Sequence, residues 1–484
     1  MKNITSFKKI IWHCLPLIGL IIWAALSITN YLWYDEAYSA ALISNNLKDL
    51  ITITSKDVHS PFYYIIAKAF FHLCGGGTHF WSLKVFSLLF SFAYLLLGKY
   101  AIKHLYNETI SIYYMLFSIL MPILTVQGTN ARMYSCGLFF FTATSICMIY
   151  IYRSEDSLLK WVLLCIFSIC SVYCHTFQMI ETLLLYIFLF TALILQKSYK
   201  KLIPFFICGI IVALAYIPWL KVTYIQMQSR ITQTAAETVT ASSDTDFTLN
   251  ALITYCKEWF SAYDMPITSV MYLGMAVTIF LGYFAINYMR REKDYIAGIG
   301  ISIIIITTLL GSYLNNNVAI CFLGRYVFSA FGALALLYAI GMQEIKKGFL
   351  KTIICIVMFY SFITQYRAEL ELEYNTEINT YFEFIEENIN EDDVIMIHPY
   401  HMLFLTIYYP ELNYMAYGHL DEWMPFKVSK VFTKWEHLEP YSGDLWFISH
   451  DPGLLSQKYT YEEALKFHHM YYDIAIYKMN PKTE

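Results

Sequence analysis

The sequence predicts an α-helical protein that crosses a membrane many times and ends in a small α/β domain. Of its 484 residues, 58% are hydrophobic and only 14% are charged. Soluble domains carry about 25% charged residues, so a cytosolic enzyme and a disordered scaffold are both excluded. The 33 basic and 37 acidic residues leave no basic excess, and we therefore expect no nucleic-acid partner.

Apolar runs long enough to span a bilayer recur along most of the chain. A hydrocarbon core needs about 20 apolar residues per helix. About eleven transmembrane helices are expected, over residues 10–30, 81–100, 109–127, 134–152, 159–175, 178–196, 202–220, 267–288, 295–314, 322–342 and 349–366. The first follows a basic start and lacks a small-residue cleavage site, so we expect an uncleaved anchor.

Basic residues are unevenly divided between the two sides of the predicted bundle. Sixteen of the 33 Lys and Arg residues fall in short connections on the side of the N-terminus. The positive-inside rule then predicts a cytoplasmic N-terminus in the cytoplasmic (inner) membrane, and an odd number of helices puts the C-terminus outside. We expect a transmembrane domain over 1–366, with outer loops at about 31–80 and 221–266, and an extracytoplasmic domain over 367–484.

The residues after 366 predict a small α/β domain. We expect a helix over 377–390, strands over 394–398, 413–417, 445–448 and 473–477, and a second helix near 461–467. Strands that alternate with helices indicate a partly parallel sheet. His398 and His401 lack a third neighbouring ligand, so we expect surface histidines rather than a metal site.

Two short polar motifs lie in the first outer loop. Asp35 and Glu36 follow the first predicted helix, and Asp57 and His59 return to the same outer surface. Alone, Asp35 and Glu36 fit the start of a helix at the lipid–water boundary, because acidic residues favour helix N-termini. Carboxylates gathered with an imidazole fit general-base chemistry or metal binding instead. The amphipathic stretch over 62–73 is expected to form a helix in the interface plane.

These motifs and two later segments resemble those of the GT-C membrane glycosyltransferases. The segments are Trp33-Tyr34-Asp35-Glu36, Asp57-Val58-His59-Ser60-Pro61-Phe62-Tyr63-Tyr64, Asn130-Ala131-Arg132-Met133-Tyr134-Ser135 and Gly324-Arg325-Tyr326-Val327-Phe328-Ser329-Ala330. Their order is similar to that in glycosyltransferase family 39, the dolichyl-phosphate-mannose protein mannosyltransferases, and in bacterial relatives that include the lipid A aminoarabinose transferases. The resemblance extends over the layout of residues 10–345 and implies a GT-C-like transmembrane domain.

The resemblance implies an enzyme that transfers a sugar from a polyprenyl-phosphate donor on the outer face of the membrane, usually with inversion. Asp35 matches the family's catalytic carboxylate and is the expected base, with Glu36 as second choice or support. The expected substrate-binding residues are Asp57, His59, Tyr63, Arg132, Tyr134, His175 and Arg325. The two arginines are assigned to the lipid phosphate, because a guanidinium forks onto phosphate oxygens. The alternative is that they reach towards lipid head groups.

One segment departs from the aminoarabinose branch. Aminoarabinose transferases tend to have Glu-Lys-Pro-Pro where this chain has Val58-His59-Ser60-Pro61. His59 would replace a lysine contact to phosphate and Val58 a carboxylate metal ligand, which puts an aminoarabinose-type donor and that branch's metal site in doubt. If the enzyme binds a divalent metal ion, its expected ligands are Asp35, Asp57 and His59.

The second long outer loop contains a stretch with few large apolar side chains that could be buried. Thr232–Asp246 is rich in Thr, Ala and Ser and is expected to be a disordered linker or a lid over the substrate. Trp259, Phe260 and Tyr263, which follow it, favour the lid because they could cover a lipid-linked sugar.

Alternative functions remain open from the sequence. One is a transporter or flippase of lipid-linked glycans, and another is a membrane-anchored binding protein that uses its tail. Transporters place ionisable residues near the bilayer midplane, whereas here they gather at the outer helix ends, which favours the enzyme. Its acceptor is a lipid, a glycan or a protein, and membrane lipids surround it.

Overall fold

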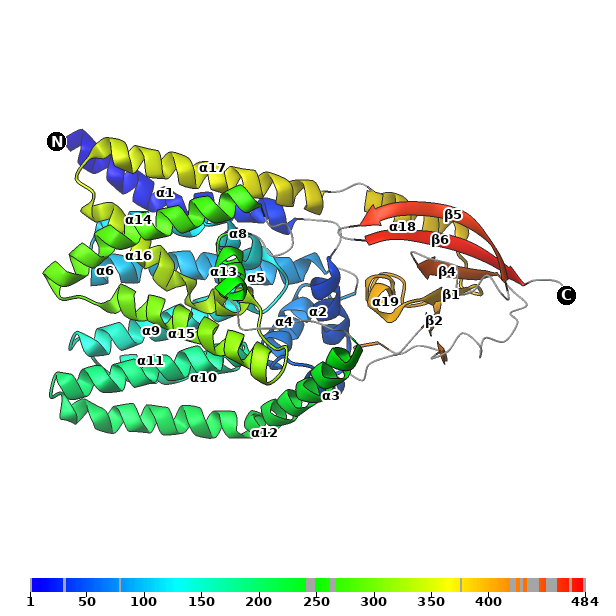
Figure 1. Ribbon diagram of the computed structural model, residues 1–484, viewed down its shortest axis with the longest axis horizontal. Coiled ribbons are helices and arrows are strands. Elements are labelled where there is room, and N and C mark those ends of the chain that lie inside the picture. Colours follow the sequence, from blue (N-terminus) through cyan, green and yellow to red (C-terminus); the bar gives the residue numbers. More distant parts are fainter. Residues whose placement is uncertain are drawn as a thin grey trace. The chain divides into compact units, whose positions relative to one another are not determined.

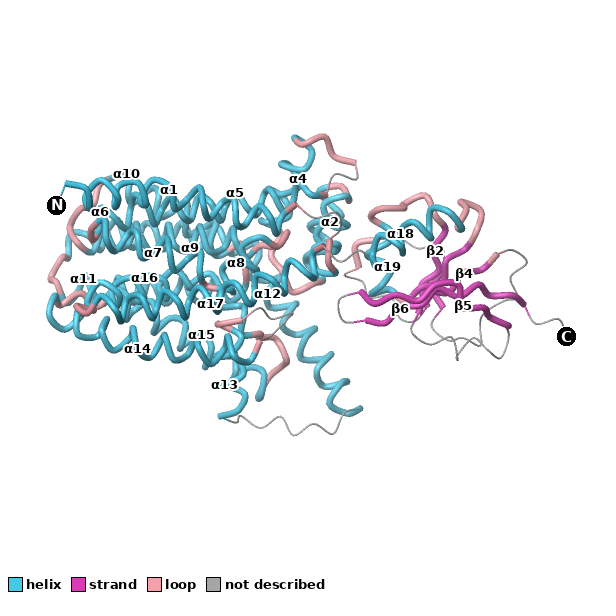
Figure 2. The backbone as a smooth tube through the Cα atoms, turned by 90° about the horizontal axis from the view of Figure 1, so that it is seen from above, coloured by secondary structure: helices cyan, strands magenta, loops and turns pink. Residues whose placement is uncertain are grey.

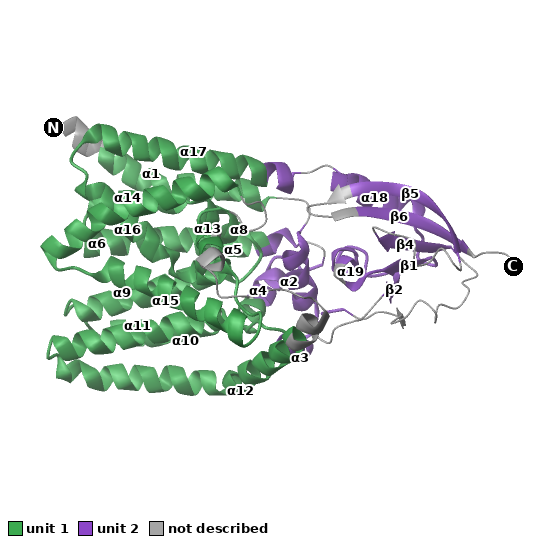
Figure 3. Ribbon diagram, in the orientation of Figure 1, with its two compact units in different colours: residues 1–28, 57–66, 84–369 green, residues 29–56, 67–83, 370–484 purple. Residues whose placement is uncertain are grey.

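The structure is a computed structural model, and it describes residues 2–28, 32–77, 80–240, 249–261, 267–374, 377–417, 424–426, 430–432, 444–449, 459–469 and 472–481. The chain forms two compact units, each made of several segments (Figure 3). Unit 1 comprises residues 1–28, 57–66 and 84–369, and unit 2 comprises residues 29–56, 67–83 and 370–484. The first outer loop is therefore divided between the two units.

Unit 1 is a bundle of long helices that run side by side (Figures 1 and 2). Its α-helices are α1 (Lys2–Ser27), α5 (Trp81–Leu97), α6 (Lys103–Leu105), α7 (Glu108–Leu120), α8 (Pro122–Thr129), α9 (Tyr134–Tyr152), α10 (Leu158–Val172), α11 (Thr176–Leu195), α12 (Leu202–Thr240), α13 (Leu249–Glu258), α14 (Thr268–Glu292), α15 (Ile296–Asn317), α16 (Phe331–Glu344) and α17 (Gly348–Glu373). Three short helices join them: η1 (Gly98–Ile102, a π-helix), η2 (Tyr199–Lys201) and η3 (Gly324–Ala330), the last two 3₁₀-helices. The final turn of α17 and the first turn of α5 belong to unit 2, and α4 (Phe62–Leu73) is divided between the two units.

Within the described residues, nine helices are long and apolar enough to cross a membrane. The chain is thus a multi-pass membrane protein, as predicted. Two of the eleven expected helices have a different form. The one expected over 109–127 is bent by 69° between α7 and α8, because Pro122 cannot continue the first helix. The one expected over 159–175 is α10, which has only 15 residues.

The α12 helix extends well beyond the span expected over 202–220. It continues to Thr240, so the predicted disordered linker or lid is helical over residues 232–240. This extension contains three Gln, two Ala and one Glu, all of which favour helices, so the helix continues without an apolar run. The remainder of that stretch, residues 241–246, lies outside the described part of the chain, as does Tyr263.

Unit 2 contains a mixed β-sheet. The described strands are β1 (Val394–Ile397), β2 (Asn413–Tyr417), β3 (Lys430–Phe432), β4 (Leu445–Ser449), β5 (Tyr459–His469) and β6 (Tyr472–Pro481). They are ordered β3-β2-β1-β4-β6-β5, with β3, β2, β1 and β4 parallel and β6 antiparallel to both β4 and β5. The predicted small α/β domain with a partly parallel sheet is confirmed.

The sheet is buried on both faces along β1. Ile395 and Ile397 pack with α18 (Glu377–Asn388), whereas Val394 and Met396 contribute to a second cluster. This alternation follows the two-residue period of a strand. The prediction of a helix near 461–467 is wrong. These residues form β5, which pairs with β6 along almost its whole length. Cross-strand pairing outweighs the helix-like spacing of this segment.

Unit 2 also holds α2 (Tyr34–Ser44) and α3 (Leu47–Lys56) from the first outer loop. The α2 helix packs against α19 (Pro399–Thr406), which follows β1. The Leu32 amide donates a hydrogen bond to the Tyr408 hydroxyl at 3.2 Å, and Asn45 Nδ2 donates to the Pro425 carbonyl at 2.7 Å. The helix that carries Asp35 is therefore fixed to the C-terminal sheet region.

Candidate active site

Four separate segments of unit 1 bring charged side chains together at helix ends. At the centre, Arg132 Nη2 lies 2.8 Å from His59 Nε2, and Arg132 Nη1 donates to the Tyr64 hydroxyl at 3.2 Å. A guanidinium is only a donor, so Nε2 of His59 accepts this hydrogen bond and the imidazole is neutral. Asp57 Oδ2 lies 3.9 Å from the same nitrogen. Asp57, His59 and Arg132 therefore lie next to one another.

The turn between α8 and α9 determines the position of Arg132. The α8 helix ends at Thr129, and a tight turn, in which the Arg132 amide donates to the Asn130 carbonyl at 2.7 Å, leads to the start of α9. Arg132 is thus placed just before the first turn of a membrane-spanning helix. Its side chain is only 3% exposed. This burial favours a role within the bundle over contact with lipid head groups.

His175 caps the N-terminus of α11 beside the cluster formed by Asp57, His59, Tyr64 and Arg132. Its Nδ1 accepts the Phe177 amide hydrogen bond at 3.2 Å, and its ring centroid lies 6.1 Å from that of His59 and 4.5 Å from that of Tyr326. Burial is the main cause that lowers the pKa of His175 well below its usual value, and His59, Arg132 and Arg325 lower it further. His175 is therefore a neutral side chain near neutral pH.

Arg325 brings a second guanidinium to the same region. It lies in η3, is half-buried, and is close enough to His175 to lower the pKa of that imidazole. Arg132 and Arg325 thus bring two guanidinium groups to this region, beside the neutral His175. The N-terminus of α11 adds its partial positive charge. Such an arrangement suits the binding of an anion such as a phosphate.

Asp35 and Glu36 lie in unit 2, in the first turn of α2. Glu36 is fully buried, and its Oε2 accepts the Trp33 amide hydrogen bond at 3.2 Å. This is the N-terminal capping contact of a glutamate at the third helical position. Asp35 is half-buried, so its carboxylate is better placed than that of Glu36 to meet a substrate.

Two predicted substrate-binding tyrosines make packing contacts. The Tyr63 hydroxyl lies 3.2 Å from Ser87 Oγ, and burial raises its pKa. The Tyr134 ring meets that of Phe328 edge to face at 6.0 Å. Neither contact points to a ligand.

Three residues of the cluster were missed by the sequence prediction. Tyr64 and Tyr326 lie within the quoted motifs and were not assigned roles, although each is next to an assigned residue. Gln226 Nε2 donates to the His59 carbonyl at 3.4 Å and belongs to the extension of α12, where a loop was expected. No signal in the sequence pointed to Gln226.

The described residues fit a metal ion poorly. No group of three or more His, Cys, Asp or Glu side chains in this part of the chain is close enough to hold one. In addition, His59 Nε2 already accepts a hydrogen bond from Arg132, and a guanidinium at that distance opposes a bound cation. We therefore assign no catalytic step to a metal.

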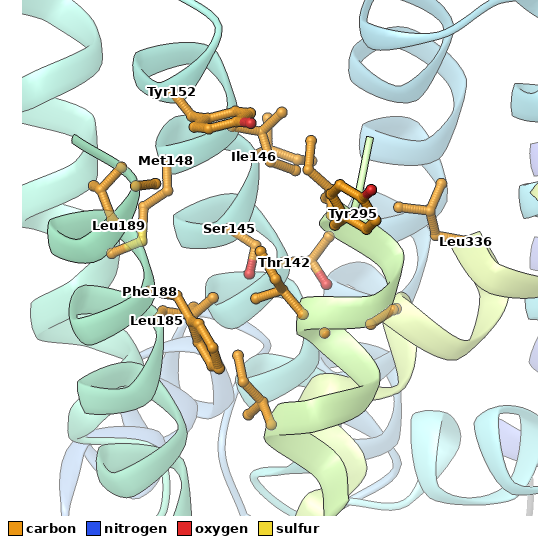
Figure 4. Close-up of a pocket in the computed structure, with 18 of the residues that line it drawn as sticks. Thr142, Ser145, Ile146, Met148, Tyr152, Leu185, Phe188, Leu189, Tyr295 and Leu336 are labelled. Carbon is orange, nitrogen blue, oxygen red and sulfur yellow. The ribbon is translucent and has the colours of Figure 1, made fainter. Parts of the chain in front are cut away.

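An apolar cavity of about 320 Å³ lies between α9, α11, α15 and α16 (Figure 4). Side chains such as Ile146, Leu185 and Leu336 line it, and a few hydroxyl groups, including that of Thr142, interrupt the apolar surface. Ala330, the last residue of η3, also lines it. Five residues separate Ala330 from Arg325, which corresponds to about 10 Å along a 3₁₀-helix. The charged cluster and the cavity therefore share one short segment.

The fold and these features define a multi-pass membrane protein of the GT-C fold, as the motif resemblance predicted. The chain is similar to ArnT from Cupriavidus metallidurans bound to undecaprenyl phosphate, with a TM-score of 0.65 and 10% identity over 96% of this chain and 97% of that one. The apo state of ArnT gives a TM-score of 0.62 at the same identity and coverage. No protein-family model and no curated protein matches the sequence.

Proposed function

We propose that this protein transfers a sugar from a polyprenyl-phosphate donor to an acceptor hydroxyl on the outer face of the cytoplasmic membrane. The observation that carries the proposal is the gathering of the Arg132 and Arg325 guanidinium groups beside His59 and His175, joined through η3 to an apolar cavity. A polyprenyl-phosphate sugar has the same two parts, an anionic head and a long apolar chain. ArnT, which has the same fold, was solved with undecaprenyl phosphate bound.

The reaction is a substitution at the anomeric carbon of the donor. The acceptor oxygen forms a bond to this carbon with inversion while the bond from the carbon to the phosphate oxygen breaks. The Asp35 carboxylate takes the proton of the acceptor hydroxyl, as a general base does. The lipid phosphate leaves with the bonding electron pair, and Arg132 and Arg325 stabilise its negative charge.

The distribution of basic residues supports the outer-face location. Connections on the N-terminal side carry sixteen of the 33 Lys and Arg residues. The cluster lies at the starts of α9, α11 and η3, and each of these starts follows a connection predicted to be outside. The positive-inside rule also favours a cytoplasmic N-terminus and an outer location of residues 367–484.

Asp35→Asn tests the assignment of the base. The variant keeps the size of the side chain and removes its basicity, so transfer from a polyprenyl-phosphate sugar in reconstituted membranes should fall to background. Glu36→Gln is the matched control, because the amide oxygen can still accept the Trp33 hydrogen bond and activity should persist. Loss of activity in Glu36→Gln but not in Asp35→Asn would make Glu36 the base and Asp35 the supporting residue. Wild-type transfer by both variants would refute a carboxylate base in this motif.

The donor sugar and the acceptor can be identified in cells. Mass spectrometry of surface glycans and glycolipids, with and without the protein, should show one sugar addition that depends on Asp35. If a glycolipid instead accumulates on the inner face of the membrane without the protein, the function is transport and not sugar transfer.

A further inference from the structure

One buried acidic residue of the bundle has no part in the proposed chemistry. Glu181 lies on α11, six residues after His175, and is fully buried. Its Oε2 accepts a hydrogen bond from the Ser329 hydroxyl of η3, and Oε1 has no hydrogen-bond partner among the described residues. Burying a carboxyl group is costly, and an ionisable residue inside a membrane span usually serves a function.

Neighbouring polar side chains on α11 bind other elements. Gln178 Nε2 donates to the Gly137 carbonyl of α9 at 2.9 Å and to Ser171 Oγ of α10 at 2.8 Å. Thr182 Oγ1 lies 2.9 Å from the same Ser171 hydroxyl. The first turns of α11 are thus hydrogen-bonded to two helices through Gln178 and Thr182, and to η3 through Glu181.

The η3 segment depends on such contacts for its position. A 3₁₀-helix has poorer internal hydrogen-bond geometry than an α-helix and is stable only in short pieces. Arg325 and Ser329 are four residues apart on η3, about 8 Å along its axis. Ala330 lines the apolar cavity, as does Leu185, one turn after Glu181 on α11 (Figure 4). The Glu181–Ser329 hydrogen bond therefore lies between the charged cluster and the cavity.

We propose that Glu181 is a positioning residue that holds η3 through Ser329 and thereby places the Arg325 guanidinium beside the His59–Arg132 pair. This inference rests on the proposed binding of a lipid phosphate at the cluster. With the carrier bound, Glu181 would lie beside the junction between its phosphate and its apolar chain. It does not touch the reacting atoms, and it acts through the position of Arg325.

The test uses the full-length protein in lipid nanodiscs and a polyprenyl phosphate as the probe. Glu181→Leu and Ser329→Ala should each weaken binding of the probe by about tenfold, because each removes the same hydrogen bond. The double variant should bind no more weakly than either single variant. Glu181→Gln, which retains an acceptor for the Ser329 hydroxyl, should restore binding to near the wild-type value.

Thr182→Val is the matched control, because it removes a buried hydrogen bond on α11 that does not reach η3. It should leave binding of the probe unchanged. Equal weakening in Thr182→Val, or additive effects in the double variant, would overturn the positioning role.

Hydrogen exchange separates this inference from the proposed function. Without any ligand, amides of residues 324–330 should exchange faster in Glu181→Leu than in the wild type or in Thr182→Val. If the wild-type protein does not bind polyprenyl phosphate, the proposed function fails, and exchange alone decides whether Glu181 holds η3. Unchanged exchange in Glu181→Leu would refute the inference even if the wild type binds the probe.

Discussion

Replacement of Arg132 tests the proposed phosphate site most directly. Arg132 is only 3% exposed, and its guanidinium donates to the Tyr64 hydroxyl and lies 2.8 Å from His59 Nε2. Arg132→Ala removes one charge-assisted contact to a bound phosphate, worth about 1.5–3 kcal/mol. This loss corresponds to about 10- to 150-fold weaker binding of a polyprenyl phosphate. Arg132→Lys keeps the charge without the planar fork and should lose roughly half of that free energy.

The assay is a binding titration with polyprenyl phosphate in nanodiscs at one fixed salt concentration. Arg291→Ala is a suitable control, since Arg291 is exposed and pairs with Glu344 at 2.6 Å outside the cluster. Thermal unfolding should be recorded for each variant to separate lost binding from lost folding. A folded Arg132→Ala protein with wild-type affinity would show that the cluster does not bind the phosphate.

Two further predictions concern stability. Tyr408→Phe removes the acceptor of the Leu32 amide hydrogen bond and should lower the free energy of unfolding of unit 2 by about 1 kcal/mol. Hydrogen exchange over residues 32–44 should rise, and an unchanged rate would contradict the packing of α2. The pKa of His175 is lowered in the folded state, so the unfolded chain binds more protons and acidification through pH 6.5 destabilises the fold. As the pH is lowered through about 6.5, the melting temperature should therefore fall more steeply in the wild type than in His175→Asn, which keeps a capping side chain. Equal slopes in the two proteins would show that His175 does not cause the destabilisation by acid.

The sequence predicted the helices of the bundle far better than its contacts. Apolar runs of span length can be recognised locally, because each depends on a few adjacent residues. The bend at Pro122 was not predicted, although a proline inside an apolar run is a local signal for such a break. Residues 461–467 could not be assigned correctly, since their strand exists only by pairing with β6. The helical extension of α12 was missed because it lacks a continuous apolar run.

The candidate site was predicted as a set of residues and not as an arrangement. The Arg132 and His59 side chains are 73 positions apart in the chain, and nothing local indicates their 2.8 Å contact. Motif resemblance selected both residues, whereas Gln226 belongs to no motif and joins the cluster only through the fold. The role of Glu36 as a helix cap likewise depends on the local backbone at Trp33.

The division of the first outer loop has a consequence for biosynthesis. Residues 29–56 and 67–83 belong to the same compact unit as residues 370–484, and the chain passes between the two units five times. The ribosome produces α2 early, yet its partners α19 and Tyr408 emerge only after the membrane helices of unit 1. The segment with Asp35 therefore gains its contacts with α19 and Tyr408 only when synthesis is almost complete. A protein truncated after the last membrane helix would lack the contacts that stabilise α2 within unit 2.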